Sequence, residues 1–256
     1  MFDPAPGLEL PQPAAEPRVL PSERVLAGLE IFLISGIPTQ ILLIAAMHSF
    51  GMPMRTPDGA MSPSFVFTVS LIDAVLVVGL VMMLLHARRE SVRDVLIGRG
   101  PVRREVMFGF ALIPLVFMVV IAVMVLVLTY APSLRNVPRN PLEDLIRNRS
   151  DAIIFGIVVM IAGGVREEVQ RGFIVHRFEG YLGGGLIGVL VYGVLFGLGH
   201  FEQGWDASVI TAFLGVLWGL VYLRRRSVIA PMVSHAGFNL AQVVKAAVLR
   251  GATGGA

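Results

Sequence analysis

The chain has 256 residues, of which 55% are hydrophobic and 15% charged, and its mean hydropathy is +0.76. Soluble domains carry about 25% charged residues, so this composition excludes an ordinary soluble protein. The formal charge of +3 and the pI near 9.8 are typical of a membrane protein with arginine-rich cytoplasmic loops, and we expect no nucleic acid partner. The absence of cysteine excludes a disulfide framework, a cysteine nucleophile and cysteine metal ligands.

Seven apolar stretches follow a polar N-terminal tail. Residues 1–24 are rich in proline and lack the apolar core of a signal peptide, which predicts a disordered tail. Each later stretch has close to the roughly 20 residues that cross a ~30 Å hydrocarbon core. They lie at 25–49, 64–86, 107–130, 152–176, 183–200, 207–223 and 228–248. No period-two strand pattern occurs, so we predict an all-α polytopic membrane protein with about seven transmembrane helices, six to eight fitting the pattern.

Composition divides these stretches into two groups. The first three, within 25–130, are rich in Leu, Val, Met and Ile. The fifth is rich in glycine, which lets membrane helices approach closely; its glycines are Gly183, Gly184, Gly185, Gly188, Gly193, Gly197 and Gly199. We therefore expect the last four stretches, within 150–248, to form a tight four-helix bundle against which the first three pack.

The distribution of Lys and Arg predicts the orientation of the chain. The side that includes the N-terminal tail and the 87–106 loop carries 12 of them, and the opposite side carries seven. The positive-inside rule then favours a cytoplasmic N-terminus, and we expect the plasma (inner) membrane. Glu30 and Asp73 are isolated acids in the first two stretches, interpreted as interfacial or helix-packing residues.

A charged segment interrupts the fourth apolar stretch. Glu167 and Arg171 are four residues apart, so on a helix they share a face and we expect them to pair. Glu168 is rotated by about 100° from Glu167, and Arg166 adds a second positive charge. Ionisable groups at bilayer depth are costly and usually mark a functional site, although a structural ion-pair cluster near the interface has the same pattern.

Two further stretches carry imidazoles. His200 ends the fifth stretch, while His235 and Asn239 lie four residues apart on one face of the seventh. An imidazole and a carboxamide one turn apart can donate two hydrogen bonds to a developing oxyanion. Separately, these residues also fit an interfacial histidine and a polar clamp between helices. Together with a carboxylate, they are the groups that activate a water molecule and polarise a carbonyl.

The same residues include a zinc-type ligand set. Glu167, His200 and His235 are two imidazoles and a carboxylate, which leave an open position on a tetrahedral metal. The spacing His-Glu-x-x-His does not occur, so a metal would be assembled across helices. The sequence leaves both a divalent metal such as zinc and a metal-free site open.

At these motifs the chain resembles the CPBP family of intramembrane proteases, also called the Rce1-like or CAAX-protease and bacteriocin-processing family. Its members carry Glu-Glu-x-x-x-Arg, Phe-x-x-x-His and His-x-x-x-Asn on successive membrane helices. The second motif is matched by Phe196 and His200, and the third by His235 and Asn239. The resemblance covers about residues 150–245.

The first motif is one residue shorter than the family pattern. Aligned on the glutamate pair, Glu167 and Glu168 match and Arg171 is displaced by about 100°. Aligned on Arg171, the two family glutamates fall on Arg166 and Glu167. Either Glu167 or Glu168 can therefore correspond to the glutamate that activates water.

The resemblance implies an endopeptidase of the metalloendopeptidase class that hydrolyses a peptide bond near the membrane. A glutamate and His200 would activate water, and His235 with Asn239 would stabilise the oxyanion. The substrate would be a peptide or protein, in some relatives lipidated, of the CAAX or bacteriocin/propeptide type. Two alternatives stay open: a non-catalytic membrane partner or immunity protein of the same fold, and a proton- or ion-coupled transporter with a polar path through Glu30 and Asp73.

Helix depth tests whether these groups can meet. At ~1.5 Å per residue, Glu167 lies ~15 Å and His235 ~11 Å from the inner ends of their stretches. His200 lies ~26 Å along the fifth stretch, which is too far across the bilayer. We therefore expect the fifth helix to begin after the 183–185 glycine run, to tilt, or to break.

Overall fold

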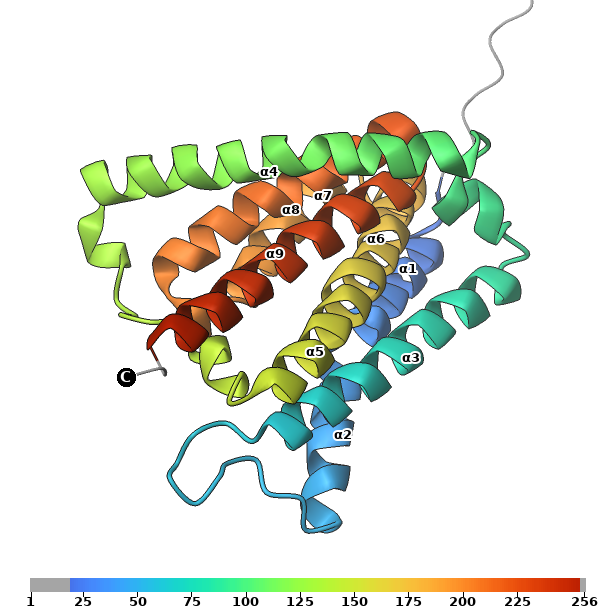
Figure 1. The fold of residues 1–256 in the computed structure, drawn as a ribbon. Coiled ribbons are helices and arrows are strands. Elements are labelled where there is room, and N and C mark those ends of the chain that lie inside the picture. Colours follow the sequence, from blue (N-terminus) through green and yellow to red (C-terminus); the bar gives the residue numbers. More distant parts are fainter. Residues whose placement is uncertain (1–18, 254–256) are drawn as a thin grey trace, which may run out of the picture.

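The computed structural model describes residues 19–253 (Figure 1). Most of the predicted tail, residues 1–18, lies outside the described residues. The first helix begins at Pro21, so the last four residues of the predicted tail are helical. Within residues 19–253 there is no β-strand, only one isolated bridge between Arg55 and Met61. The predicted all-helical class is confirmed.

Nine α-helices and five short π or 3-10 segments make up the described residues. The α-helices are α1 (Pro21–Ile34), α2 (Ile37–Ser49), α3 (Pro63–Ala87), α4 (Val102–Tyr130), α5 (Arg149–Val158), α6 (Glu167–Tyr181), α7 (Gly185–Leu198), α8 (Trp205–Arg225) and α9 (Ile229–Thr253). The π-helical segments are η1 (Arg93–Ile97) and η4 (Val159–Arg166), and the 3-10 segments are η2 (Pro132–Leu134), η3 (Pro141–Leu145) and η5 (Phe201–Gln203). Segments α5, η4 and α6 follow one another as a single long rod (Figure 1).

Four stretches of the described chain are long and apolar enough to cross a membrane. They are Pro21–Ser49, Pro63–Ala87, Arg93–Tyr130 and Trp205–Arg225, and α7 is a shorter apolar helix. Large apolar side chains cover the outer surface, as expected for contact with lipid; Val75 is 71% exposed and Ile121 61%. The protein is therefore an integral membrane protein, while the number of seven spans stays a prediction.

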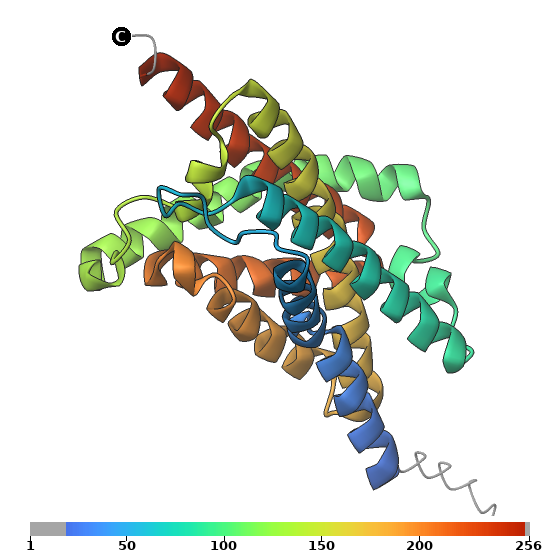
Figure 2. The ribbon, with the colours of Figure 1, turned by 90° about the horizontal axis from the view of Figure 1, so that it is seen from below.

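The first predicted span is not one continuous helix. It breaks between α1 and α2 at Ser35 and Gly36, and Figure 2 shows the axes of the two helices running in clearly different directions. Gly36 has φ +87°, a left-handed conformation that favours glycine, and a Cβ there would collide with the guanidinium of Arg166. Non-helical backbone at membrane depth occurs where it is buried in protein or lines a cavity, and Ser35 and Gly36 do line one.

Glycines bring α7 close to the helices on either side of it. A Cβ on Gly193 would lie 2.6 Å from Cγ2 of Val216 in α8, and one on Gly188 would lie 2.6 Å from Cβ of Phe178 in α6. Such distances are shorter than real side chains tolerate, so larger residues would push the helices apart. The glycine-rich stretch thus places α7 tightly between α6 and α8.

Ion pairs join the first helices to the C-terminal half. Glu30 of α1 accepts hydrogen bonds from Arg88 and from Arg177 of α6. Asp73 of α3 is paired with Arg166 at 2.8 Å and accepts a hydrogen bond from Thr39. The interpretation of Glu30 and Asp73 as helix-packing acids is confirmed.

Candidate active site

Glu168 lies at the start of α6 and, like Arg171, is almost fully buried. Its side chain is 1% exposed, forms an ion pair with Arg171, and accepts a hydrogen bond from Nδ1 of His235 at 2.8 Å. The predicted pairing of Glu167 with Arg171 is therefore wrong. Residues three apart share a helix face as residues four apart do, and here Arg171 pairs with the glutamate nearer to it in the sequence.

Arg171 is enclosed by aromatic rings. Its guanidinium carbon lies 4.7 Å from the ring centroid of Phe196, 5.3 Å from that of Tyr192 and 5.4 Å from that of Trp218. Two of its nitrogens, Nε and Nη2, have no hydrogen-bond partner among the described residues. The faces of the rings attract the cation instead. Arg171 therefore neutralises the buried Glu168 carboxylate from the side of the aromatic core and does not line the cavity.

His235 of α9 lies between the two glutamates. Its ring stacks on Trp218 at a centroid distance of 3.9 Å and an interplanar angle of 18°. Its Nδ1 contacts Glu168, and its Nε2 lies 3.7 Å from Oε2 of Glu167. Trp218 is held in turn by a hydrogen bond from its Nε1 to Oγ of Ser234 at 3.0 Å. The imidazole is thus fixed in both position and ring plane.

Asn239 lies directly over the backbone of η4. A Cβ built on Gly163 would be 2.3 Å from Nδ2 of Asn239 and 3.8 Å from Nε2 of His235. A Cβ on Gly164 would be 2.7 Å from Cβ of Ala236, so α9 packs against bare backbone here. Short π-helical segments often occur at functional sites, and this one immediately precedes Glu167.

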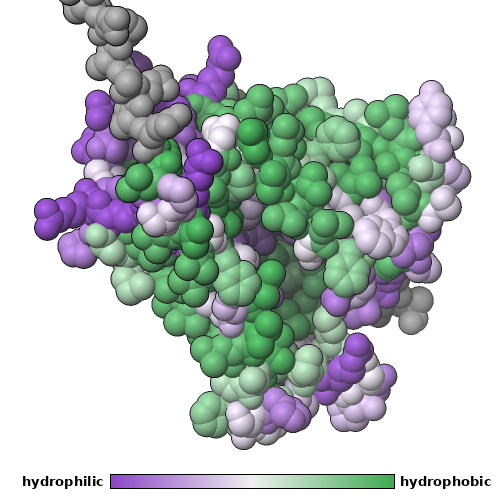
Figure 3. Space-filling view, turned by 180° about the vertical axis from the view of Figure 1, so that it is seen from behind, coloured by the Kyte–Doolittle hydropathy of each residue, from purple (hydrophilic) through white to green (hydrophobic). Residues whose placement is uncertain are grey.

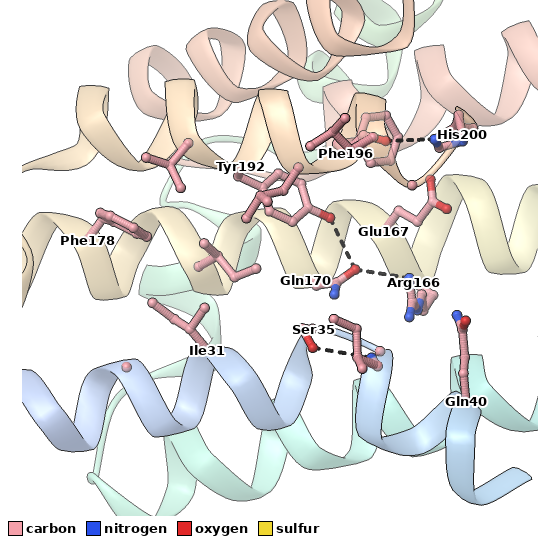
Figure 4. Close-up of a pocket in the computed structure, with 18 of the residues that line it drawn as sticks. Ile31, Ser35, Gln40, Arg166, Glu167, Gln170, Phe178, Tyr192, Phe196 and His200 are labelled. Carbon is pink, nitrogen blue, oxygen red and sulfur yellow. Dashed lines mark hydrogen bonds between the residues drawn. The ribbon is translucent and has the colours of Figure 1, made fainter. Parts of the chain in front are cut away.

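His200 lies just beyond the end of α7, and its orientation is set by its own helix. Its Nδ1 lies 2.7 Å from the carbonyl oxygen of Phe196, and its ring packs edge-on against the Phe196 ring at 4.8 Å. A carbonyl only accepts, so Nδ1 carries the proton and a neutral His200 presents the lone pair of Nε2. Figure 4 shows the Glu167 carboxylate directed toward the His200 ring on the α6–α7 side of the cavity.

The depth mismatch expected for His200 has a simple resolution. Helix α6 runs to Tyr181, beyond the predicted end at residue 176, and α7 begins at Gly185, after the other two glycines of the 183–185 run. Glu167 therefore lies roughly 21 Å from one side of the connecting turn and His200 roughly 22 Å from the other. The two residues reach the same level.

A cavity of about 600 Å³ lies between the α1–α2 pair and the α6–α7 pair. Its walls are largely apolar, and Figure 3 shows this face hollowed, with polar residues in its depth. Its polar lining residues gather around Glu167; they are Ser35, Gln40, Arg166, Glu167, Gln170, Tyr192 and His200. Glu168, His235 and Asn239 are not part of this lining and lie behind Glu167.

The possible metal ligands do not converge. Within residues 19–253, no group of three or more His, Asp or Glu residues is arranged to hold a metal ion. Glu167 is near His235 and faces His200, but the three do not form one coordination site. As arranged in the described part of the chain, these side chains do not fit the divalent metal that the sequence left open.

Arg166 points away from the catalytic candidates. Its guanidinium pairs with Asp73 and donates a hydrogen bond to Oε1 of Gln170 at 3.0 Å. The alignment that places a family glutamate at position 166 therefore puts a helix-packing arginine there. The alignment on Glu167 and Glu168 instead brings two carboxylates to His235, and we favour it.

Three residues of the site were not predicted. Trp218 stacks on His235, Gly163 makes room for Asn239, and Gln170 links Arg166, Tyr192 and the end of α1. Tryptophans of membrane helices usually lie at the interfaces, so Trp218 in the middle of an apolar helix was a usable signal. The adjacent pair Gly163–Gly164 was another.

Fold and site together define an integral membrane protein with a buried carboxylate–imidazole cluster beside a cavity. Residues 149–241 match the family model described as type II CAAX prenyl endopeptidase Rce1-like. This segment contains all three motifs, so the resemblance read from them is confirmed, and the match supports a CAAX-type intramembrane protease in general. Searches of curated proteins and of solved structures found no match for the chain.

Proposed function

We propose that this protein is an intramembrane endopeptidase in which Glu167 and His200 activate a water molecule. The observation that carries the proposal is that both side chains line one cavity and the Glu167 carboxylate is directed toward the His200 ring. Neither the Glu167 carboxylate nor Nε2 of His200 is engaged in a hydrogen bond with the described residues. Two acceptors suit the two hydrogens of one water molecule.

Glu167, and not Glu168, is the better candidate for the base. Glu168 is 1% exposed, and both Arg171 and His235 contact its Oε1. The side chain of Glu167 is 20% exposed, with Nε2 of His235 as its nearest ionic contact at 3.7 Å. A base needs a free lone pair and access to water, and Glu167 has both.

The hydrolysis then follows in two proton transfers. The water oxygen attacks the substrate carbonyl carbon while Glu167 accepts a proton from the water, and the carbonyl π electrons move to oxygen. When the tetrahedral intermediate collapses, the C–N bond breaks and Glu167 returns the proton to the leaving amine. Atoms and charges balance without another reactant.

We propose that His235 and Asn239, which lie behind Glu167, stabilise the oxyanion. The ionised Glu168 only accepts, so Nδ1 of His235 donates to it, and Nε2 can donate only from the imidazolium form. Glu168 lies 2.8 Å from Nδ1 of the ring and Glu167 lies 3.7 Å from Nε2. The Asn239 amide donates without a charge. Each such donor is worth about 10²–10³ in kcat in enzymes where one has been removed.

The alternatives make different demands on the structure. A transporter would need a polar path through Glu30 and Asp73, yet these are engaged in separate ion pairs with arginines. A non-catalytic partner would retain the fold without hydrolysing a peptide, and a peptide-cleavage assay distinguishes it from a protease.

We further propose a plasma-membrane location with a cytoplasmic N-terminus, because the arginines are concentrated on the side of the chain that includes the N-terminal tail. Fusion of a compartment-sensitive reporter to each terminus tests this orientation.

The test is cleavage of a fluorogenic, farnesylated CAAX peptide by the purified full chain in liposomes, with an unprenylated propeptide as second substrate. We expect Glu167→Gln to lower kcat by about 10²–10⁴-fold with an unchanged melting temperature. The matched control is Glu143→Gln in η3, outside the cavity lining, which should retain full activity. Equal activity of wild type and Glu167→Gln would contradict the assignment, and a wild type that cleaves neither peptide would favour the non-catalytic partner.

Metal removal is tested in the same assay. Because the candidate ligands do not form one coordination site, we propose that hydrolysis continues after dialysis against EDTA. Loss of activity on dialysis and its recovery with zinc would show that the site rearranges around a metal.

A further inference from the structure

On the wall of the cavity opposite Glu167, the side-chain amide of Gln40 has no hydrogen-bond partner among the described residues. Gln40 lies in the first turn of α2, within the apolar span Pro21–Ser49, and lines the cavity. Its position is roughly 14 Å from the end of that span at Ser49. Gln40 is exposed, so its unpaired amide is accessible to a ligand in the cavity.

The other neutral polar side chains near Gln40 are already engaged. Oγ of Ser35 donates to the carbonyl of Phe32 at 2.7 Å. Gln170 donates from Nε2 to the carbonyl of Ile34 at 2.6 Å and accepts on Oε1 from Tyr192 at 3.1 Å. Two glutamines therefore line one cavity, and only Gln40 has both its donor and its acceptor unused.

The break between α1 and α2 holds Gln40 in place. The carbonyl of Gly36 accepts a hydrogen bond from the backbone N–H of Gln40 at 2.9 Å, and Oγ1 of Thr39 lies 3.0 Å from the same oxygen. The end of α1 is tied to α6 through Gln170, and Thr39 is tied to α3 through Asp73. Figure 4 shows the Gln40 side chain directed from α2 toward the part of the cavity where Arg166 and Glu167 lie.

We infer that Gln40 binds the peptide backbone of the substrate across the cavity from Glu167; the inference rests on the proposed function. A carboxamide donates to a carbonyl and accepts from an N–H, which is the pair of groups that one edge of an extended peptide presents. The apolar walls provide contacts for the side chains or lipid of that peptide. A substrate-binding residue would thus come from α2, outside the segment 149–241 that matches the family model.

Cross-linking tests this contact without requiring turnover. Because the chain has no cysteine, Gln40→Cys introduces a single thiol, here in the Glu167→Gln background. The probe is the farnesylated CAAX peptide with a bromoacetyl group on the residue next to the scissile bond. The matched control is Leu182→Cys, which lines the same cavity at the C-terminal end of α6, 15 residues beyond Glu167. Labelling by iodoacetamide, measured in parallel, corrects for differences in thiol reactivity.

We expect the Gln40→Cys variant to cross-link to the probe at least about tenfold more than the Leu182→Cys variant, with excess unmodified peptide suppressing the product. Equal cross-linking at both positions, or none at position 40, would overturn the inference.

Kinetics give a second readout. In Gln40→Leu we expect KM to rise about tenfold with kcat nearly unchanged, since one backbone contact is lost while Glu167 and His200 remain. Gln40→Asn keeps the amide and should recover part of the loss. A wild type that cleaves the peptide while Gln40→Leu has an unchanged KM refutes the role of Gln40 and leaves the proposed function intact. A wild type without activity refutes the proposed function, and the cross-link still decides whether peptide contacts Gln40.

Discussion

Glu168 and His235 are joined by a 2.8 Å hydrogen bond between α6 and α9, across 67 positions of sequence. Arg171 pairs with the same carboxylate oxygen, Oε1, so the carboxylate stays ionised and accepts from Nδ1. The bond therefore fixes which imidazole nitrogen turns toward Glu167. Arg171, the ion-pair partner of Glu168, packs on the ring of Phe196 and so connects the Glu168–His235 pair to the aromatic core.

The first prediction concerns Glu168→Gln. The neutral amide leaves the guanidinium of Arg171 buried without its counter-charge, and removing one partner of a buried ion pair typically costs about 3–5 kcal/mol. We expect a lower free energy of unfolding, measured by thermal unfolding in detergent micelles, together with a loss of peptide hydrolysis because His235 is no longer oriented.

The double variant Glu168→Gln/Arg171→Met separates these two effects. It removes the unpaired charge, so it should recover much of the stability lost in the single variant, since apolar replacements of buried ion pairs are often neutral. Hydrolysis should stay low, because the carboxylate acceptor for Nδ1 of His235 is still missing. Recovery of full activity would show that the Glu168–His235 bond has no part in the reaction.

The second prediction concerns Gly163→Ala. The new methyl group would occupy space within 2.3 Å of the present position of Nδ2 of Asn239, so the amide must move. Because only the end of a side chain is displaced, we expect the melting temperature to change little while kcat falls, by up to the 10²–10³-fold that an oxyanion donor is worth.

Gly79→Ala is the matched control for this substitution. It lies within helix α3, and a Cβ there would meet no atom within 4 Å. It should leave kcat unchanged and, by the helix propensity of alanine, slightly raise stability. A Gly163→Ala enzyme as active as Gly79→Ala would mean that the position of the Asn239 amide is unimportant.

The sequence predicted the class of fold well because that class depends on composition. A charged fraction of 15% and repeated apolar stretches require helices in a membrane, whatever their tertiary contacts. The break between α1 and α2 was missed because hydropathy averages over it. The local signal for the break was Gly36 followed closely by Pro38. It was overlooked because the residues on both sides are mostly apolar.

The candidate site could be predicted as a set of residues but not as a set of partners. The motifs placed Glu167, Glu168, His200 and His235 near one another through the resemblance, whereas periodicity assigned Arg171 to the wrong glutamate. Within the regular helix α6, Arg171 is one turn from both glutamates, three residues from Glu168 and four from Glu167. Spacing alone cannot choose between the two, because the choice depends on tertiary contacts such as that of His235 with Glu168 and that of Phe196 with Arg171.

The third prediction concerns the fully buried Arg177, which joins α6 to the first and third helices. It pairs with Glu30 of α1 and with Glu90, at 2.7 Å, just beyond α3. Arg177→Met leaves Glu30 with Arg88 alone and Glu90 with only a weak contact from His176 at 3.5 Å. We expect the free energy of unfolding to fall by about 3–5 kcal/mol, because two carboxylates lose their shared counter-charge.

Arg139→Met is the control for the loss of Arg177. Its ion pair with Glu143 at 3.2 Å is solvent-exposed, with 53% of the arginine side chain accessible, and such pairs are worth about 0–1 kcal/mol. Chemical unfolding of both variants in the same micelles measures the difference. Because α1 and α2 form one wall of the cavity, Arg177→Met should also weaken peptide binding, which appears as a higher KM. If the two variants unfold at the same denaturant concentration, the Glu30–Arg177–Glu90 cluster does not hold α1 against α6.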